Sequence, residues 1–404
     1  MTRKCTIAVD DFHAGPHRPG KRPGVIFLVR HAPGRIGGVS THCSRLAAGL
    51  SRSFEVESIN WHGPDWASMF YSPAFYFRSA RSSAQLVHCD DALTSLIGSL
   101  IRSGTGKKVV ATAHGMDVIM PIPWYQRMLT RALTRMDAVV CVSRATAEAV
   151  RKRGVDPRRI EIIPNSAEVL SNPLEKDEQI YRDIQQLTGI DLRGKKVLFS
   201  LGRPIKRKGF DYFISDVFPH LPPDCVYIAA GPGTKTPGWA GPMARLMGKK
   251  RIHLALVALG MDSVHEKLVE LSRRPRVYYL NDISDQLRNM LYYASDLFIM
   301  PNRRVEGDME GFGIVALEAS VRGVPVVATG IEGITDAVVE GKNGYCVPER
   351  DPEAMARTIR RLLENQVELS ELGKKAAEFS MQRFSSETVT RQYEAVFTRV
   401  LRRP

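Results

Sequence analysis

Two glutamates with seven residues between them, Glu310 and Glu318, have a spacing that suggests chemistry. They flank a turn of Gly311, Phe312 and Gly313, which leads into an apolar run with the pattern of a buried helix. A glycine turn that opens a helix leaves backbone N–H groups unpaired, and these suit an anionic ligand. If the helix begins near Gly313, one glutamate precedes it and the other lies about 7–8 Å along its axis. Carboxylates placed in this way can bind the hydroxyls at both ends of an elongated ligand, such as a nucleotide sugar.

The two glutamates, the turn between them and the following segment GVPVVA resemble the signature of retaining glycosyltransferases of family 4. An isolated glutamate pair at this spacing is more often solvated on a helix surface, but the glycines and the apolar filling favour the family pattern. The resemblance implies the GT-B architecture, an α/β fold in which two Rossmann-like domains face each other across a cleft. It also implies that Glu310 is catalytic and that Gly311, Phe312, Gly313 and Glu318 bind the nucleotide sugar.

The length and composition of the chain are those of a two-domain globular protein, with 404 residues, of which 44% are hydrophobic and 25% charged. The net charge of +14 predicts attraction to phosphates, an acidic membrane surface or nucleic acid. Six scattered cysteines without metal-ligand spacing predict reduced thiols and no metal site. No segment has the pattern of a signal peptide or a membrane span. We therefore expect a cytoplasmic protein with at most peripheral contact at the inner face of the cell membrane.

The first half of the chain alternates apolar runs with helical patterns, which predicts a parallel sheet covered on both faces. The strand at 25–29 precedes a loop that contains Gly37 and Gly38, and such a loop can offer N–H groups to a phosphate. The resemblance places these glycines near the donor diphosphate and the acceptor. His114 follows the strand at 108–113, at the edge where parallel sheets bind ligands. A histidine alone is more often structural there, but the resemblance gives His114 a catalytic role close to the donor sugar.

Residues 121–136 have a basic amphipathic pattern in which Arg127, Arg131 and Arg135 recur every four residues. The apolar face is assigned to Trp124, Met128, Leu129, Ala132, Leu133 and Met136. Such a helix fits either a membrane interface or an ordinary helix whose apolar side packs on the sheet. The stretch 234–276, with its run GKKRIHLALVALGM, leaves a similar choice between lipid headgroups, a cover for the cleft and burial in its own domain.

A domain boundary is expected within residues 165–196, where a polar stretch separates two strand patterns. The resemblance then divides the chain into an N-terminal acceptor-binding domain at 1–170 and a C-terminal nucleotide-sugar-binding domain at 171–385. The final segment, 386–404, is expected to form a helix that packs back on the N-terminal domain.

The second domain opens with a strand and the loop GRPIKRKG. Cations at the end of such a strand can stabilise the negative charge that develops on a leaving diphosphate. In the resembled family this pattern has that role, so Arg203 and Lys208 are expected to be catalytic and Gly202 to contact the nucleotide sugar. Lys206 and Arg207 fit a solvated basic turn instead.

Two further segments of the second domain match the family pattern less specifically. Ile283 lies in a turn after the strand at 277–280, and its backbone is expected to contact the base. Arg303 and Arg304 precede Glu310, and they either face the acceptor or are solvated.

Together these features predict a retaining glycosyltransferase that moves a sugar from a UDP- or GDP-sugar to a hydroxyl of a lipid-linked, polysaccharide or other envelope glycan acceptor. No metal or other cofactor is expected. Glycoside hydrolases place two carboxylates across the scissile bond, whereas Glu310 and Glu318 would lie along the donor, so neither is expected to be a covalent nucleophile. One alternative is a sugar-nucleotide epimerase of GT-B architecture, for which the sequence offers no acid–base pair. The other is a non-catalytic basic scaffold that binds membrane or nucleic acid, but without an aromatic RNA-binding signature we expect no nucleic-acid partner.

Overall fold

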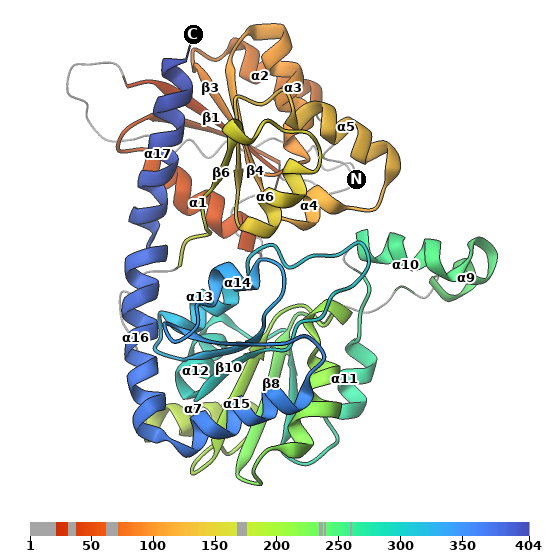
Figure 1. The fold of residues 1–404 in the computed structure, drawn as a ribbon, viewed down its shortest axis with the longest axis vertical. Helices are drawn as coiled ribbons and strands as arrows, with labels where there is room; N and C mark the ends of the chain where they lie inside the picture. The colour runs from red at the N-terminus through yellow and green to blue at the C-terminus, as the bar shows by residue number, and fades with distance from the viewer. Residues whose placement is uncertain are drawn as a thin grey trace, which may run out of the picture. The chain divides into compact units, whose positions relative to one another are not determined.

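The computed structural model of the protein describes residues 22–30, 38–61, 72–167, 176–233, 237, 240–258 and 261–403. The chain divides into two compact units: unit 1 comprises Met1–Ser166 and Ser386–Pro404, and unit 2 comprises Ala167–Ser385. Each unit contains a parallel six-stranded sheet covered by helices (Figure 1). The predicted α/β class with two Rossmann-like domains is confirmed.

The sheet of unit 1 has the strand order β2-β1-β3-β4-β5-β6. Its strands are β1 (Gly24–Val29), β2 (Glu55–Asn60), β3 (Leu86–Cys89), β4 (Lys108–Ala113), β5 (Ala138–Cys141) and β6 (Ile160–Ile162). The central strands β1, β3, β4 and β5 are almost entirely buried. A strand that is covered by helices on both faces needs apolar residues on both, which explains continuous runs such as GVIFLV in β1.

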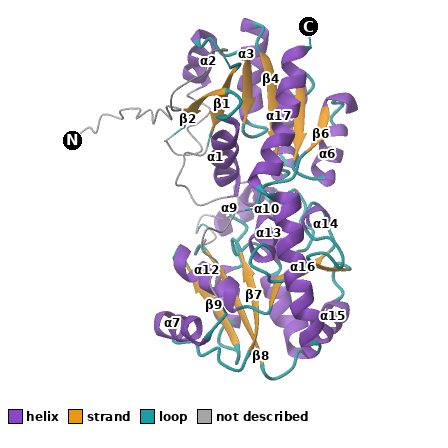
Figure 2. Ribbon diagram, turned by 90° about the vertical axis from the view of Figure 1, so that its left-hand side faces the viewer, coloured by secondary structure: helices purple, strands orange, loops and turns teal. Residues whose placement is uncertain are grey.

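Helices cover both faces of the unit 1 sheet. They are α1 (Gly38–Leu50), α2 (Ser72–Arg81), α3 (Thr94–Thr105), α4 (Met116–Ile119), α5 (Pro123–Leu133), α6 (Arg144–Arg151) and α17 (Ser386–Arg402). Buried residues of α2, α3, α5 and α6 share one apolar cluster with the sheet, whereas α1 and α17 share a second cluster on the other face. Figure 2 shows α1 and α17 side by side, in agreement with their contacts. The C-terminal helix α17 therefore completes the core of unit 1.

Unit 2 has the strand order β12-β11-β10-β7-β8-β9. Its strands are β7 (Lys196–Leu201), β8 (Cys225–Gly231), β9 (Val277–Asn281), β10 (Leu297–Met300), β11 (Val326–Thr329) and β12 (Gly344–Val347). The neighbours β7 and β10 are parallel, with Leu198 paired to Leu297 and Phe199 to Phe298. The loops that follow these two strands therefore leave the sheet at the same edge.

In four cases the helices of unit 2 begin at a polar side chain that accepts a hydrogen bond from a backbone N–H of the first turn. They are α7 (Glu178–Thr188), α8 (Phe210–Tyr212), α9 (Ala240–Met247), α10 (Lys249–Ala258), α11 (His265–Leu271), α12 (Asp285–Ala294), α13 (Ile314–Ser320), α14 (Ile334–Ala337), α15 (Pro352–Glu364) and α16 (Gln366–Phe384). Asp177, Ser284, Asp351 and Asn365 cap α7, α12, α15 and α16 in this way. The N–H group of Ala167 donates to the Phe384 carbonyl oxygen at 2.6 Å, so the two ends of unit 2 meet.

Helix α5 exposes two side chains of its predicted apolar face. Leu129 is fully buried against the sheet, but the side chains of Trp124 and Met128 are 52% and 46% exposed. Of the two alternatives for this face, packing on the sheet therefore holds for Leu129 but not for Trp124 and Met128. With 3.6 residues per turn, these positions share a side with Arg127 and Arg131, which are also exposed.

In the stretch 234–276, α9 and α10 pack against each other around a small apolar cluster of their own, which contains Ala240, Ile252 and Leu256. Burial in its own domain was one of the alternatives for this stretch. Among its helices, α11 joins the main core of unit 2 through Leu268. Among the helices that the structure describes, none is long and apolar enough to cross a membrane.

Candidate active site

A cluster of charged side chains lies where β7 and β10 end in unit 2. The Nζ atom of Lys208, from the loop after β7, is 2.7 Å from Oε2 of Glu310, from the loop after β10. The Asn302 side chain donates to the same oxygen at 2.9 Å, and the Arg207 guanidinium also contacts it. The pairing of β7 with β10 thus brings together two groups that the sequence analysis predicted to be catalytic, Lys208 and Glu310.

The cations around Glu310 determine its charge. Burial alone would raise the pKa of this carboxyl, but Arg207 and Lys208 outweigh it and lower the pKa from 4.5 to about 2. Glu310 is therefore ionised at neutral pH. All three of its side-chain donors in the described residues bind Oε2, and Oε1 receives none.

Arg207 was predicted to lie in a solvated basic turn, but the structure shows that its side chain is buried. Its side chain is only 6% exposed, and its Nε lies 2.9 Å from Oδ2 of Asp308. The Glu310 and Asp308 carboxylates raise the pKa of the Arg207 guanidinium despite its burial, so it remains charged. Lys206, in the same turn, is exposed as predicted and pairs with Asp262 at 3.0 Å.

Arg303 and Arg304 form ion pairs within unit 2. Arg303 lies 2.5 Å from Asp211, and Arg304 lies 2.7 Å from Glu349. These contacts hold the loop between β10 and Glu310 against the rest of the unit. Arg303 is half-buried at its ion pair with Asp211, whereas Arg304 stays exposed, as the solvated alternative predicts.

Two glycines shape the loop that carries Lys208. Gly209 has a φ of 66°, and a Cβ atom there would lie 1.9 Å from the Pro301 carbonyl oxygen, so no other residue fits without movement of the backbone. Gly202 follows β7 with a φ of 151°, and a Cβ there would lie 3.1 Å from Cε of Lys208. The aliphatic part of Lys208 passes directly over Gly202, while Arg203, the next residue, is exposed.

The turn before α13 presents unpaired backbone donors. Gly313 precedes the helix with a φ of 94°, and the first helical hydrogen bond runs from Ala316 N–H to the Gly313 carbonyl oxygen at 2.9 Å. No acceptor in the described part of the chain receives the N–H groups of Phe312, Gly313 or Ile314. Such donors suit an anion, as the sequence predicts for Gly311, Phe312 and Gly313.

Glu318 lies on α13, half-buried, and one of its oxygens is already held. The Tyr292 hydroxyl donates to Oε2 of Glu318 at 2.8 Å, and the Arg322 guanidinium lies over the Tyr292 ring at 5.1 Å. Tyr292 is fully buried and was not predicted as a site residue. Its hydrogen bond fixes the orientation of the Glu318 carboxylate.

The turns after β8 and β9 are connected by Asp282. This residue has a φ of 50°, and its Oδ1 accepts a hydrogen bond from the N–H of Gly233 at 3.1 Å. Ile283, the predicted base-binding residue, is half-buried in the same turn, directly before Ser284 caps α12.

Glu332 is a further acidic residue beside Glu310, and the sequence analysis missed it. Its carboxylate accepts a hydrogen bond from the backbone N–H of Glu310 at 2.6 Å. Its φ of 50° is unfavourable for a residue with a side chain, which indicates that the surrounding contacts hold it in place. Burial raises the pKa of Glu332 from 4.5 to about 7, against the opposing effects of that hydrogen bond and of Arg207.

The raised pKa predicts that Glu332 makes stability depend on pH. The folded protein binds this proton more tightly than the unfolded chain, so the contribution is fully present below pH 4.5 and is lost as the pH rises through about 7. The Glu332→Gln variant keeps an acceptor for the Glu310 N–H but cannot titrate. Relative to this variant, we expect the wild type to lose on the order of 2 kcal/mol of unfolding free energy between about pH 5 and 8.

Denaturant unfolding at a series of pH values tests this prediction. Glu340→Gln, at an exposed glutamate of the same unit, is the matched control and should follow the wild type. If the unfolding free energies of the wild type and Glu332→Gln changed equally with pH, the proposed titration of Glu332 would be contradicted.

In unit 1, the predicted residue His114 directly follows β4. Its Nε2 lies 2.8 Å from the Asp90 carbonyl oxygen, and its backbone N–H donates to Oδ1 of Asp117 at 3.0 Å. Because a carbonyl oxygen can only accept, Nε2 carries the proton and Nδ1 is the acceptor in the neutral ring. Gly38 is the first residue of α1, whereas Gly37 lies outside the described residues.

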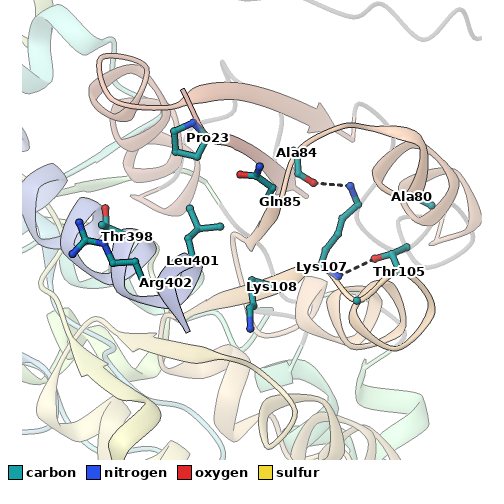
Figure 3. A pocket seen from close by; sticks show the side chains of 11 residues that line it. Pro23, Ala80, Ala84, Gln85, Thr105, Lys107, Lys108, Thr398, Leu401 and Arg402 are labelled. Atoms are coloured by element: carbon teal, nitrogen blue, oxygen red, sulfur yellow. Dashed lines mark hydrogen bonds between the residues drawn. The ribbon is translucent and has the colours of Figure 1, made fainter. Parts of the chain in front are cut away.

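A hollow of about 830 Å³ in unit 1 lies at the opposite edge of the sheet, where the strands begin. Pro23 and Gln85, directly before β1 and β3, line it together with Lys108 at the start of β4 and with Leu401 and Arg402 of α17 (Figure 3). Lys107, which also lines the hollow, donates to the carbonyl oxygens of Ser82 and Ala84, each at 2.6 Å. None of the predicted site residues lines this hollow. Elsewhere in the described residues, no group of three His, Cys, Asp or Glu side chains is placed to hold a metal ion.

Comparisons with known proteins agree with the two-unit α/β fold. Anabaena HepE, solved in complex with UDP and glucose, superposes with a TM-score of 0.68 at 17% identity, covering 93% of this chain and 100% of HepE. Sucrose-phosphate synthase from Thermosynechococcus elongatus gives a TM-score of 0.69 at 18% identity, covering 93% and 99%. The protein thus has the GT-B fold.

The sequence comparisons identify the family. Residues 189–379 match the model for glycosyl transferases group 1, and residues 54–169 match that for glycosyltransferase family 4. D-inositol 3-phosphate glycosyltransferase of Corynebacterium efficiens is 26% identical over 329 residues, 78% of this chain and 70% of that protein. The lipopolysaccharide core mannosyltransferase LpsB of Rhizobium meliloti is 27% identical over 67% of this chain and 68% of LpsB. The chain belongs to the group 1 and family 4 glycosyltransferases.

Proposed function

We propose that the protein is a retaining hexosyltransferase. It moves a sugar from a UDP- or GDP-sugar to a hydroxyl of a lipid-linked, polysaccharide or other envelope glycan acceptor, without a metal ion or other cofactor. An acceptor of this kind would place the protein at the cytoplasmic, inner face of the cell membrane.

The arrangement of donors around Glu310 carries the proposal. Lys208, Arg207 and Asn302 all bind Oε2 and fix the carboxylate, whereas Oε1 receives no hydrogen bond within the described residues. An ionised oxygen in a fixed position accepts hydrogen bonds from sugar hydroxyls with little loss of conformational entropy. We therefore assign Glu310 to the sugar of the donor.

The other end of the donor would extend along α13. The free N–H groups of Phe312, Gly313 and Ile314 are suited to diphosphate oxygens, and Glu318, oriented by Tyr292, is suited to the ribose hydroxyls. Lys208 and the exposed Arg203 would stabilise the negative charge on the departing diphosphate. The Ile283 backbone would contact the base, as the family resemblance implies.

The low pKa of Glu310 argues against a covalent intermediate on this residue. A carboxylate with a pKa of about 2 is a weak base and a weak nucleophile, and its cations favour the free anion. In the proposed step the bond from the anomeric carbon to the diphosphate oxygen breaks, and the acceptor oxygen bonds to the same carbon on the same face. The acceptor proton passes to the leaving diphosphate oxygen, so neither glutamate needs to accept it.

The roles of His114, Gly37 and Gly38 are supported by the family resemblance. His114 is proposed to contact the donor sugar, and because Nε2 donates to the Asp90 carbonyl oxygen, Nδ1 is the ring nitrogen that remains for this contact. Gly37 and Gly38 are proposed to approach the diphosphate and the acceptor.

The names of similar proteins support both donor classes. HepE was solved with UDP and glucose, which supports a UDP-sugar. A GDP-mannose-dependent phosphatidylinositol monomannoside mannosyltransferase of Mycolicibacterium smegmatis is 27% identical over 274 residues, which supports a GDP-sugar and a lipid acceptor. The capsular and lipopolysaccharide enzymes among the relatives support an envelope acceptor.

Incubation of the protein with radiolabelled UDP- and GDP-sugars tests the proposal. We expect slow hydrolysis of one donor class without acceptor and faster transfer when a membrane lipid extract is added. Proton NMR of the first product should show the same anomeric configuration as the donor. An inverted product would contradict retention, sugar isomerisation would indicate an epimerase, and the absence of turnover with every donor would overturn the proposal.

A further inference from the structure

The outer surface of three neighbouring helices in unit 1 combines exposed apolar side chains with arginines. We call it the α2–α3–α5 face and define it by Phe77 of α2, Leu100 of α3, and Trp124 and Met128 of α5. These four side chains are 46–58% exposed. Helix α3 packs against both α2 and α5, and Figure 1 shows the three helices together on one side of the sheet.

The core of unit 1 does not need these side chains. Phe75, Ile97, Ile101, Tyr125 and Leu129 of the same helices fill the apolar cluster against the sheet. Exposed large apolar side chains that gather on one face indicate a surface that binds something, whereas single ones are common on any protein.

The charge of the face is of one sign. The sequences of α2, α3 and α5 contain no aspartate or glutamate, and their charged residues are all arginines. Arg81, Arg127, Arg131 and the adjoining Arg135 are exposed, and no described carboxylate lies within ion-pair distance of them. Elsewhere in the protein exposed arginines commonly have such partners, as Arg151 does with Glu148 at 2.7 Å.

We propose that the α2–α3–α5 face docks on the surface of an anionic lipid bilayer. Trp124 and Met128 share one side of α5 with Arg127 and Arg131, so the apolar side chains can enter the interface while the guanidinium groups remain at the lipid phosphates. An indole near the helix start is well suited to the headgroup region. This inference assigns a lipid surface to residues outside the active site, and it does not depend on the identity of the donor or the acceptor.

Cosedimentation of the full chain with vesicles tests the proposal without any sugar donor. We expect binding to vesicles of equal parts phosphatidylglycerol and phosphatidylcholine, little binding to phosphatidylcholine alone, and weaker binding when salt rises from about 0.1 M to 1 M. The double variant Arg127→Gln/Arg131→Gln should reduce partitioning roughly 30-fold, and Trp124→Ser/Met128→Ser at least about tenfold.

Matched variants in unit 2 serve as controls. Arg357→Gln/Arg360→Gln removes two exposed arginines of α15, and Leu187→Ser/Val367→Ser removes two exposed apolar side chains, so both should bind vesicles like the wild type. Unchanged thermal unfolding and unchanged donor hydrolysis would show that the variants in unit 1 are folded.

Three outcomes would overturn the proposal: failure of the wild type to bind anionic vesicles, binding of the α5 variants equal to that of the wild type, and equal losses in the control variants. Analytical ultracentrifugation covers a further possibility. If the α5 variants convert a dimer to a monomer and vesicles do not bind, the face is an interface with a second copy of the chain.

Discussion

The Lys208→Met variant is expected to lose roughly 10³-fold in kcat/KM for its nucleotide-sugar donor, most of it in kcat. The Nζ atom of Lys208 lies 2.7 Å from Oε2 of Glu310, and the stem of the side chain crosses Gly202. In the proposed reaction Lys208 stabilises charge that develops on the diphosphate only as the glycosidic bond breaks. Methionine keeps the aliphatic length, and Arg207 still neutralises Glu310. The loss should therefore appear in the chemical step, with a small change in KM.

Initial-rate kinetics of donor hydrolysis and transfer measure this effect, with thermal unfolding as the check on folding. Lys206→Met removes a cation from the same turn, but Lys206 is exposed and faces Asp262, so its activity should stay within about twofold of the wild type. A Lys208→Met enzyme with a normal kcat and a raised KM would mean that Lys208 contributes equally to binding the ground state, and it would contradict the proposed role.

The sequence predicted the features that depend on local pattern. Continuous apolar runs such as VIFLV identified buried parallel strands, because only a strand covered on both faces tolerates such a run. The family resemblance identified Glu310 with Glu318, and Arg203 with Lys208, as site residues. The structure adds that Lys208 and Glu310 are in direct contact, which follows from the adjacency of β7 and β10.

The features that sequence could not supply depend on contacts between distant segments. Three consecutive basic residues at 206–208 have no internal pattern that shows which one is buried. Arg207 is buried because it meets Glu310, 103 residues later, and Asp308. Glu332 likewise becomes important only because its turn packs against the Glu310 backbone. The exposed Trp124 and Met128 are different, since helical periodicity alone places them on the same side of the helix as Arg127 and Arg131.

The Arg207→Leu variant is expected to lose about 3–5 kcal/mol of unfolding free energy in unit 2, because removal of one member of a buried ion cluster leaves its partners without compensation. The side chains of Arg207 and Asp308 are 6% and 7% exposed, so water cannot replace the lost contact. Glu310 keeps Lys208 and Asn302, which makes Asp308 the principal unpaired charge. Chemical denaturation followed by far-UV circular dichroism measures the loss.

A double variant separates loss of charge pairing from loss of packing. If the unpaired Asp308 carboxylate causes the destabilisation, Arg207→Leu/Asp308→Asn should recover part of the stability, whereas a cost due to packing would remain unchanged.

The pH dependence of the stability gives a second criterion. Arg207 helps to lower the pKa of Glu310 from 4.5 to about 2, so its stabilising effect through Glu310 is present above pH 4.5 and is lost as the pH falls through 2. The difference between the wild type and Arg207→Leu should therefore narrow on acidification from neutral pH. A difference that stays constant down to the acid unfolding transition would show that Arg207 stabilises unit 2 by its volume, and that the buried cations are not what keeps Glu310 ionised.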